Sequence, residues 1–248
     1  TTFEKCNFTL CETPYDKGGA LFVEDKLNSN NIEELKLQDC IFDNCNSSEG
    51  SAIYAKLSSK PTIRKCTVKN NNQGCSVFVL MFVTEEPLPV VEIETCTFQN
   101  NVYMNTPEQP DGGGSGIWIS NANKLQFTDC DFIKNKADYV GGALAFGHDA
   151  KFAECSIQFD NCIFEDNTCN GKYGGALYLV NSKPVIIRNS NFKGNRPLAS
   201  DDLKGGDIYI DSSSTVDISS STFESSTAQI SEGNALYCSS RASTLTLS

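Results

Sequence analysis

Cysteine is the most reactive residue type in this chain, which has 12 cysteines among 248 residues. Zinc sites use closely spaced cysteine pairs, commonly with histidines, but here the nearest cysteines stand five residues apart and the chain has one histidine. No Cys-x-x-Cys redox motif is present. The cysteines therefore predict structural sulfur, and we expect neither a metal site nor a cofactor.

Carboxylates raise the question of a polysaccharide lyase or hydrolase, because such enzymes use acidic side chains around one glycosidic bond. The candidates are Asp201 with Asp202, Asp129 with Asp131, and the lone His148. Adjacent acids rarely face one substrate, and no cluster of basic residues accompanies the histidine. We therefore expect a protein that is not an enzyme, with no catalytic residue assigned, and keep the polysaccharide enzyme as the second alternative.

Charge and hydrophobicity exclude two classes of partner. The net charge of -11 would repel a nucleic-acid phosphate backbone, so we expect no nucleic-acid partner. No run of 18 or more apolar residues occurs, which predicts no membrane insertion within this segment. The chain starts at Thr1 without a leader-like sequence, so we expect a mature or excised segment.

Two short phrases alternate along the whole chain. The first starts with glycine: GGALFV at Gly18, GSAIYA at Gly50, GCSVFV at Gly74, GSGIWI at Gly114, GGALAF at Gly141, GGALYL at Gly174, GGDIYI at Gly205 and GNALYC at Gly233. The second starts at Cys6, Cys40, Cys66, Cys96, Cys130, Cys162, Ser190 and Ser221, and usually continues x-Phe. Successive second phrases lie 26 to 34 residues apart, which indicates one structural unit with variable loops.

Each unit contains strand patterns and no helical pattern. Alternating apolar pairs such as Leu125 and Phe127 precede the second phrase, two polar residues then suit a bend, and inward pairs such as Leu177 and Leu179 follow the glycines. We predict an all-β fold, a right-handed parallel β-helix of about eight coils with three short strands per coil, forming a single domain over residues 1–248. Leucine-rich repeats and propellers fit the period and signatures less well.

Stacked coils turn each repeat position into a ladder of like side chains. The predicted inward ladders are Phe8, Phe42, Val68, Phe98, Phe132, Phe164, Phe192 and Phe223; Asn71, Asn101, Asn135, Asn167 and Asn195; and the six cysteines Cys6, Cys40, Cys66, Cys96, Cys130 and Cys162. We expect all three to be structural, through ring stacking, amide pairing and small apolar thiols.

Cysteine content and sequons favour secretion. Cys11 and Cys45 occupy the asparagine position of consecutive coils and form the best candidate pair for a disulfide, although free stacked thiols would also fit. Asn7 and Asn46 begin Asn-x-Ser/Thr sequons and are candidate N-glycosylation sites. We therefore expect an extracellular or cell-surface location.

The two phrases together resemble the repeat pair of the chlamydial polymorphic outer membrane proteins. The resemblance rests on GGA[L/I], strict at Gly18, Gly141 and Gly174, and on Phe-x-x-Asn, as from Phe98 to Asn101. It covers nearly the whole chain and implies a β-helical, surface-exposed passenger with adhesive or structural roles. The cysteine ladder and the sequons depart from a standard bacterial passenger, and no membrane anchor is carried over.

Outward aromatics form the predicted interaction surface. Between the inward residues of the glycine-started strands stand Phe22, Tyr54, Phe78, Trp118, Tyr178, Tyr209 and Tyr237, with Ala145 as the gap. An exposed apolar stripe marks an interface, whereas loops folded over the rings would make it structural. The partners we expect are other copies of the chain, other surface proteins, or glycans.

The sequence thus predicts an extracellular structural or adhesive β-helical protein of a surface or filament, with a glycan-binding module as the first alternative. Neither end has a polar cap of the kind solenoids use, so we expect a segment of a longer protein or a protomer that stacks end to end.

Overall fold

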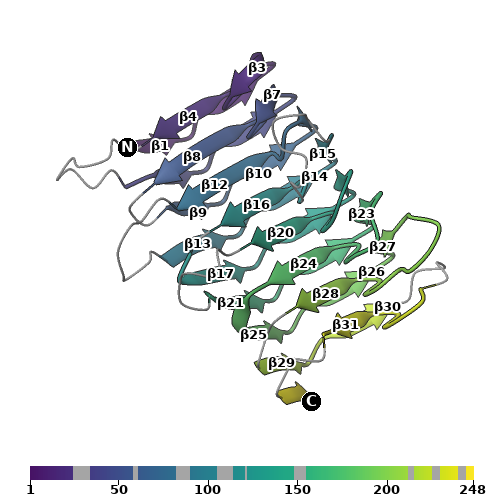
Figure 1. The fold of residues 1–248 in the computed structure, drawn as a ribbon. Helices are drawn as coiled ribbons and strands as arrows, with labels where there is room; N and C mark the ends of the chain where they lie inside the picture. Colours follow the sequence, from purple (N-terminus) through teal and green to yellow (C-terminus); the bar gives the residue numbers. More distant parts are fainter. Residues whose placement is uncertain are drawn as a thin grey trace.

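A computed structural model describes residues 1–24, 34–57, 61–81, 90–104, 114–120, 122–147, 155–211, 215–224, 230–239 and 244–248. Every regular element in these ranges is a β-strand. The chain winds through successive coils that stack from the N-terminal to the C-terminal end in one line (Figure 1).

Four parallel sheets run along the stack, and we name them A to D in the order in which a coil visits them. Sheet A contains β1 (Thr2–Glu4), β5 (Lys36–Gln38), β9 (Thr62–Arg64), β13 (Val90–Glu94), β17 (Lys124–Thr128), β21 (Cys155–Asp160), β25 (Ser182–Arg188), β29 (Thr215–Ser219) and β32 (Thr244–Leu247). Sheet B contains β2 (Asn7–Thr9), β6 (Ile41–Asp43), β10 (Thr67–Lys69), β14 (Thr97–Gln99), β18 (Asp131–Ile133), β22 (Ile163–Glu165), β26 (Asn191–Lys193) and β30 (Thr222–Glu224).

The other two sheets complete each coil. Sheet C contains β3 (Glu12–Lys17), β7 (Asn46–Glu49), β11 (Asn72–Gln73), β15 (Val102–Tyr103), β19 (Lys136–Ala137), β23 (Thr168–Cys169) and β27 (Arg196–Pro197). Sheet D contains β4 (Leu21–Glu24), β8 (Ile53–Leu57), β12 (Val77–Met81), β16 (Ile117–Ser120), β20 (Leu144–Gly147), β24 (Leu177–Val180), β28 (Ile208–Asp211) and β31 (Leu236–Cys238).

The parallel β-helix is confirmed, but the prediction of three strands per coil is wrong. Each complete coil has four strands, and the unpredicted one belongs to sheet C, in the segment expected to be a loop. From β11 onward these strands are only two residues long. A two-residue strand has no alternating apolar pair, so the periodicity that revealed the other strands could not reveal this one.

Two corners of the coil hold residues of many types in the left-handed backbone conformation. The corner between sheets A and B uses Lys5, Asp39, Lys65, Thr95, Asp129, Asn161, Asn189 and Ser220, with φ from 48° to 54°. The corner between sheets B and C uses Leu10, Asn44, Asn70, Asn100, Lys134, Asp166 and Gly194. The predicted polar bends are the first of these corners, between sheets A and B, and in both corners Asn and Asp tolerate positive φ better than most residues do.

The third corner, between sheets C and D, has glycine at positive φ in most coils. Gly141 has φ +57°, and a Cβ placed on it would lie 2.3 Å from the carbonyl oxygen of Leu144. Gly18, Gly50, Gly114, Gly174, Gly205 and Gly233 show the same clash with the carbonyl three residues later, whereas in the coil of Gly74 the positive φ falls on Gln73. The glycine phrase is therefore a corner motif, and the strand begins after it.

The predicted phenylalanine ladder fills the core behind sheet B. Its rings are paired in register, with adjacent centroids 4.5 to 5.0 Å apart and planes within 9° of parallel, from Phe8 to Phe42 and from Phe98 to Phe223. Val68 takes the intervening position between Phe42 and Phe98. Ring stacking adds on the order of 1 kcal/mol per pair to the burial of the rings.

The asparagine ladder is fully buried and forms a continuous hydrogen-bond chain. Asn135 shows the pattern: its side-chain amide donates to the Phe98 carbonyl at 2.9 Å and to Asn167 Oδ1 at 2.9 Å. Its own Oδ1 accepts from the backbone and side-chain amides of Asn101, at 3.2 and 2.9 Å. Each amide thereby satisfies the turn backbone of one coil and the side chain of the next.

The cysteine ladder satisfies the corner between sheets A and B. Each thiol donates to the carbonyl two residues earlier, as Cys130 does to Thr128 at 3.2 Å. Ser190 repeats this bond with its hydroxyl, donating to the Arg188 carbonyl at 2.7 Å, and Ser221 donates to Ser219 at 2.9 Å. Serine can therefore replace cysteine in the last coils because the position needs a small donor, not sulfur.

Replacing Gly141 by alanine should lower the free energy of unfolding by at least about 1–2 kcal/mol, because the new Cβ meets both positive φ and the Leu144 carbonyl. Gly147, at the other end of β20, is the matched control, since a Cβ placed there would meet no described atom within 4 Å and its φ is not positive. Urea denaturation of both variants measures the difference. Equal midpoints for the two would contradict the corner role of Gly141.

Candidate functional site

The predicted outward aromatics share one line on sheet D. Strand pairing sets them opposite one another from Phe22 on β4 to Tyr237 on β31, with Ala145 on β20 between Trp118 and Tyr178. We call this set, Phe22, Tyr54, Phe78, Trp118, Tyr178, Tyr209 and Tyr237, the sheet D ladder. The side chain of Phe78 lies outside the described part of the chain, although its backbone register is clear.

Exposure along the sheet D ladder is uneven. Phe22 is 52% exposed and Tyr54 only 4%, while Trp118, Tyr178, Tyr209 and Tyr237 are half-buried. Neighbouring rings stack: Phe22 on Tyr54 at 5.2 Å, Tyr178 on Tyr209 at 5.3 Å and Tyr209 on Tyr237 at 5.1 Å between centroids. Stacked rings cover one another's flat faces, so the ladder turns mainly ring edges outward.

Side chains from the sheet C corner cover part of the ladder. Tyr54 forms a small apolar cluster with Cys75, Tyr103, Ala137 and Cys169, and Trp118 packs against that cluster. The alternative in which the chain covers its own aromatics therefore holds for Tyr54 and, in part, for Trp118. The C-terminal half, from Tyr178 to Tyr237, keeps the longer stacked and partly open run.

Lys17 also covers Tyr54. Its ammonium lies 4.7 Å from the Tyr54 ring centroid, donates to the Tyr54 hydroxyl at 3.3 Å and pairs with Glu49 at 3.0 Å. Burial alone would lower the pKa of Lys17, but the bonds to Glu49 and Tyr54 outweigh it and raise the pKa. The lysine therefore stays charged over the ring.

Burial and charge keep Tyr178 and Tyr209 protonated. Burial, followed by the nearby Asp211 carboxylate, raises the pKa of both Tyr178 and Tyr209 above the ordinary value. Their hydroxyls therefore act as neutral hydrogen-bonding groups at any physiological pH.

A hollow of about 470 Å³ lies at the sheet C corner of the same coils. It is lined by Asp138, Tyr139, Val140, Asn170, Gly171, Lys172, Tyr173 and Ala199. Sequence reasoning missed both of its tyrosines, because only residues between inward pairs were interpreted as outward. The available signal is their place beside the corner glycine: Tyr173 directly precedes Gly174, and Tyr139 stands two residues before Gly141.

Asp207 makes one coil chemically different from its siblings. It replaces the alanine of the glycine phrase, is 1% exposed, and accepts a hydrogen bond from the Asn195 side-chain amide at 2.9 Å. The buried asparagine ladder thus ends on a carboxyl group. Burial raises the pKa of Asp207 to about 7, although the bond from Asn195 works in the opposite direction.

The acids considered for catalysis are scattered among solvated contacts. Asp201 and Asp202 are exposed, and they lie 3.5 Å from Lys172 and 3.9 Å from Lys204 respectively. Asp129 accepts from the side-chain amide of Asn161 at 2.6 Å in a corner ladder. His148 lies outside the described residues. The expectation of a protein that is not an enzyme stays a prediction.

Cys11 and Cys45 occupy equivalent positions of consecutive coils, as their following residues Glu12 and Asn46 are paired. Both thiols are free in this structure, and burial raises the pKa of Cys45 to about 11. The disulfide remains a prediction. Of the two sequon asparagines, Asn7 is exposed, whereas Asn46 is half-buried with its Oδ1 inaccessible, so Asn7 is the better acceptor for a glycan.

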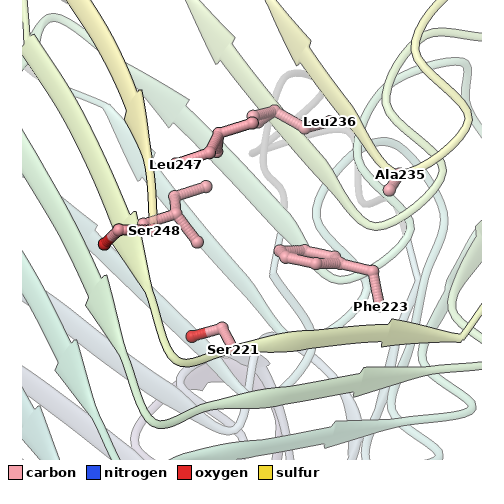
Figure 2. Close-up of a pocket in the computed structure, with 7 residues that line it drawn as sticks. Ser221, Phe223, Ala235, Leu236, Leu247 and Ser248 are labelled. Atoms are coloured by element: carbon pink, nitrogen blue, oxygen red, sulfur yellow. The ribbon is translucent and has the colours of Figure 1, made fainter.

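The C-terminal end of the stack is apolar. A cavity of about 490 Å³ there is lined by Ile218, Ser221, Phe223, Ala235, Leu236, Leu247 and Ser248. Figure 2 shows the ring of Phe223 beneath Leu236 and Leu247, which come from different sheets. These residues continue the core ladders, so the cavity is the open end of the core. The expected end-to-end stacking or longer chain remains a prediction.

Two further kinds of site do not occur within the described ranges. No group of three or more potential metal-ligating side chains comes together there. None of the described elements is a helix capable of crossing a membrane.

Four parallel sheets wound around one apolar core, with an aromatic ladder on one face, define a parallel β-helix solenoid. Comparison with known families then identifies the group: the family described as "Right handed beta helix region" matches residues 1–157 and 90–248. The chain belongs to this family, and the predicted right-handedness agrees with its description.

A similar curated protein is the "Probable autotransporter YfaL" of Escherichia coli (strain K12). It is 29% identical over 131 residues, which are 53% of this chain and 10% of that protein. The chain therefore matches about a tenth of the relative's length. No solved structure matches the chain. These comparisons support a β-helix family, and the more specific resemblance to the polymorphic outer membrane proteins stays a prediction.

Asp207 should make stability depend on pH in an unusual direction. Its pKa rises from 3.8 to about 7 on folding, so the folded chain keeps a proton that the unfolded chain releases across that window. Stability should fall as pH rises from about 4 to 7 and stay low above 7. Asp207→Asn keeps an acceptor for Asn195 and should remove this loss, on the order of 1.4 kcal/mol per unit of displaced pKa.

Thermal and urea unfolding at pH 5 and pH 8 measure the effect. The control is Asp129→Asn, at an exposed corner where other coils carry Asn161 and Asn189. If the advantage of Asp207→Asn is the same at both pH values, Asp207 does not titrate as described.

Proposed function

We propose that this chain is a rigid β-helical stem of an extracellular, cell-surface protein with an adhesive or structural role and no catalytic activity. Similarity to an autotransporter over half the chain supports the location. The dense cysteine content and the exposed sequon asparagine Asn7 are in keeping with it.

The observation that carries the adhesive role is the sheet D ladder. It runs in register over eight strands and leaves Phe22 and the run from Tyr178 to Tyr237 partly open, on a core that holds their positions fixed. A line of aromatic edges suits a flat protein partner, because edges fit between side chains of a second surface. The partners we propose are other surface proteins or further copies of the chain.

Glycan binding along the same ladder is the alternative function. A sugar ring packs its C–H groups against a flat aromatic face, but the stacked pairs on sheet D use those faces for each other. This alternative therefore depends on places where a ring face is open. A polysaccharide lyase or hydrolase is the second alternative, supported if turnover of an acidic polysaccharide is lost when Asp201 and Asp202 are changed to Asn.

Beads coated with the protein should be retained on immobilised copies of the chain or on cultured epithelial cells more than beads coated with albumin. The double variant Trp118→Ala/Tyr178→Ala removes two ladder rings and should reduce retention by about tenfold, or roughly 1.4 kcal/mol. Ile163→Ala, which removes a 41% exposed apolar residue on sheet B, is the matched control.

Two outcomes would overturn the proposal. One is retention no better than albumin on both surfaces; the other is equal retention of the wild-type chain and the double variant while circular dichroism shows both folded. Loss in Ile163→Ala as large as in the double variant would place adhesion elsewhere on the rod.

A further inference from the structure

The hollow at the sheet C corner lies at a repeat position where one coil has a large side chain and the next two coils have glycine and alanine. Strand pairing of Ala137 with Cys169, and of Cys169 with Pro197, sets Tyr139, Gly171 and Ala199 one above another two residues later. The backbone bond from Ala199 to Gly171, at 3.4 Å, continues this register. A large ring is thus followed by two coils with almost no side chain, and space opens beneath it.

Glycine is required at the middle of this hollow. A Cβ on Gly171 would lie 1.7 Å from the Tyr139 carbonyl oxygen, so no side chain fits there without moving the backbone. The buried Val140 and Ala199 supply apolar parts of the lining. The space is therefore fixed by the coil geometry and lies within the size range of small-ligand sites.

Two tyrosines bound the hollow in different ways. Tyr173 is held by a tilted contact with Tyr209, 4.7 Å between centroids. Tyr139 is 47% exposed, and among the described residues no ring contact involves it. Tyr139 lines the hollow, so the ring surface that it leaves exposed is available to a ligand there.

Polar groups also line the hollow. The Asn170 side-chain amide donates to Asp138 Oδ1 at 2.7 Å, and the Lys172 ammonium lies 3.5 Å from Asp201 Oδ1. These paired groups supply both donors and acceptors at fixed places, with little net positive charge. The chain as a whole carries a net charge of -11.

We propose that this hollow binds a neutral pyranose unit of a glycan, with Tyr139 as the stacking platform and Asp138, Asn170 and Lys172 as hydroxyl partners. A sugar ring has one apolar face of C–H groups and a rim of hydroxyls that donate and accept, which matches an aromatic wall beside paired polar groups. The acidic surroundings disfavour phosphates and uronic acids. This inference rests on the proposed extracellular function, since glycans are ligands of cell surfaces.

Saturation-transfer NMR and calorimetry with purified full chain test the inference. The probes are neutral hexasaccharides of N-acetylglucosamine, glucose, mannose and xylose, with oligogalacturonate as the acidic comparison. At least one neutral probe should bind with a dissociation constant of about a millimolar or tighter, and oligogalacturonate should bind more weakly.

Two variants attack the site in different ways. Tyr139→Ala removes the platform, and Ala199→Leu fills the hollow from an accessible position; each should weaken binding by about tenfold or more. Tyr15→Ala is the matched control, because Tyr15 is a 97% exposed tyrosine on β3 of the same sheet C and should leave binding unchanged.

Absence of binding by every neutral probe at a probe concentration of about 10 mM would overturn the inference. Equal affinity in the wild-type chain, Tyr139→Ala and Ala199→Leu would also overturn it. Tighter binding of oligogalacturonate would overturn the assignment to neutral sugars. Bead retention through the sheet D ladder is measured separately with Trp118→Ala/Tyr178→Ala. Absent sugar binding with intact retention therefore refutes the hollow alone, and absent retention with intact sugar binding refutes the adhesive ladder alone.

Discussion

Parallel hydrogen bonding between coils, in fixed register, is the constraint on which the rest of this molecule depends. Each strand pairs with the equivalent strand of the neighbouring coils. Every side chain must therefore pack against the side chain at the equivalent position of the next coil. Repeat length can vary from 26 to 34 residues because the variation falls between strands, where register is not set. The phenylalanine, asparagine and sheet D ladders are consequences of this one rule.

Three corners make the register possible, and the chain solves them with different chemistry. Two corners accept Asn, Asp or Lys at positive φ, and a thiol or hydroxyl on the next residue of the first corner caps a carbonyl of the bend. The third corner uses glycine at positive φ in most coils, because the chain turns against its own carbonyl three residues later, and the coil of Gly74 places Gln73 there instead. Part of the cysteine content is thus explained by the need for a hydrogen-bond donor to a backbone carbonyl at this corner. A serine hydroxyl meets the same need at Ser190, so the fold continues without the cysteine.

Sequence reasoning could reach the fold and the identity of each ladder, since these depend on patterns within one repeat. It missed the sheet C strands, which from β11 onward are too short to show a period, and the degree to which Tyr54 is covered, which depends on Lys17 from the preceding coil. The hollow beside Tyr139 could not be predicted either, because it forms where Gly171 and Ala199 have no large side chain to fill the space. Asp207 is visible in the sequence as the acid of GGDIYI. Its role could not be predicted, because it depends on the hydrogen bond from the side chain of Asn195.

The asparagine ladder also gives the rod a direction. Every bond from one asparagine side chain to the next runs towards the C-terminal end, from Asn71 to Asn195, and Asn195 donates to Asp207 within its own coil; at the other end Asn71 Oδ1 accepts from the Cys45 backbone at 2.8 Å. A coil inserted in the reverse orientation would break this run of amide bonds, so the two ends of the rod are not equivalent.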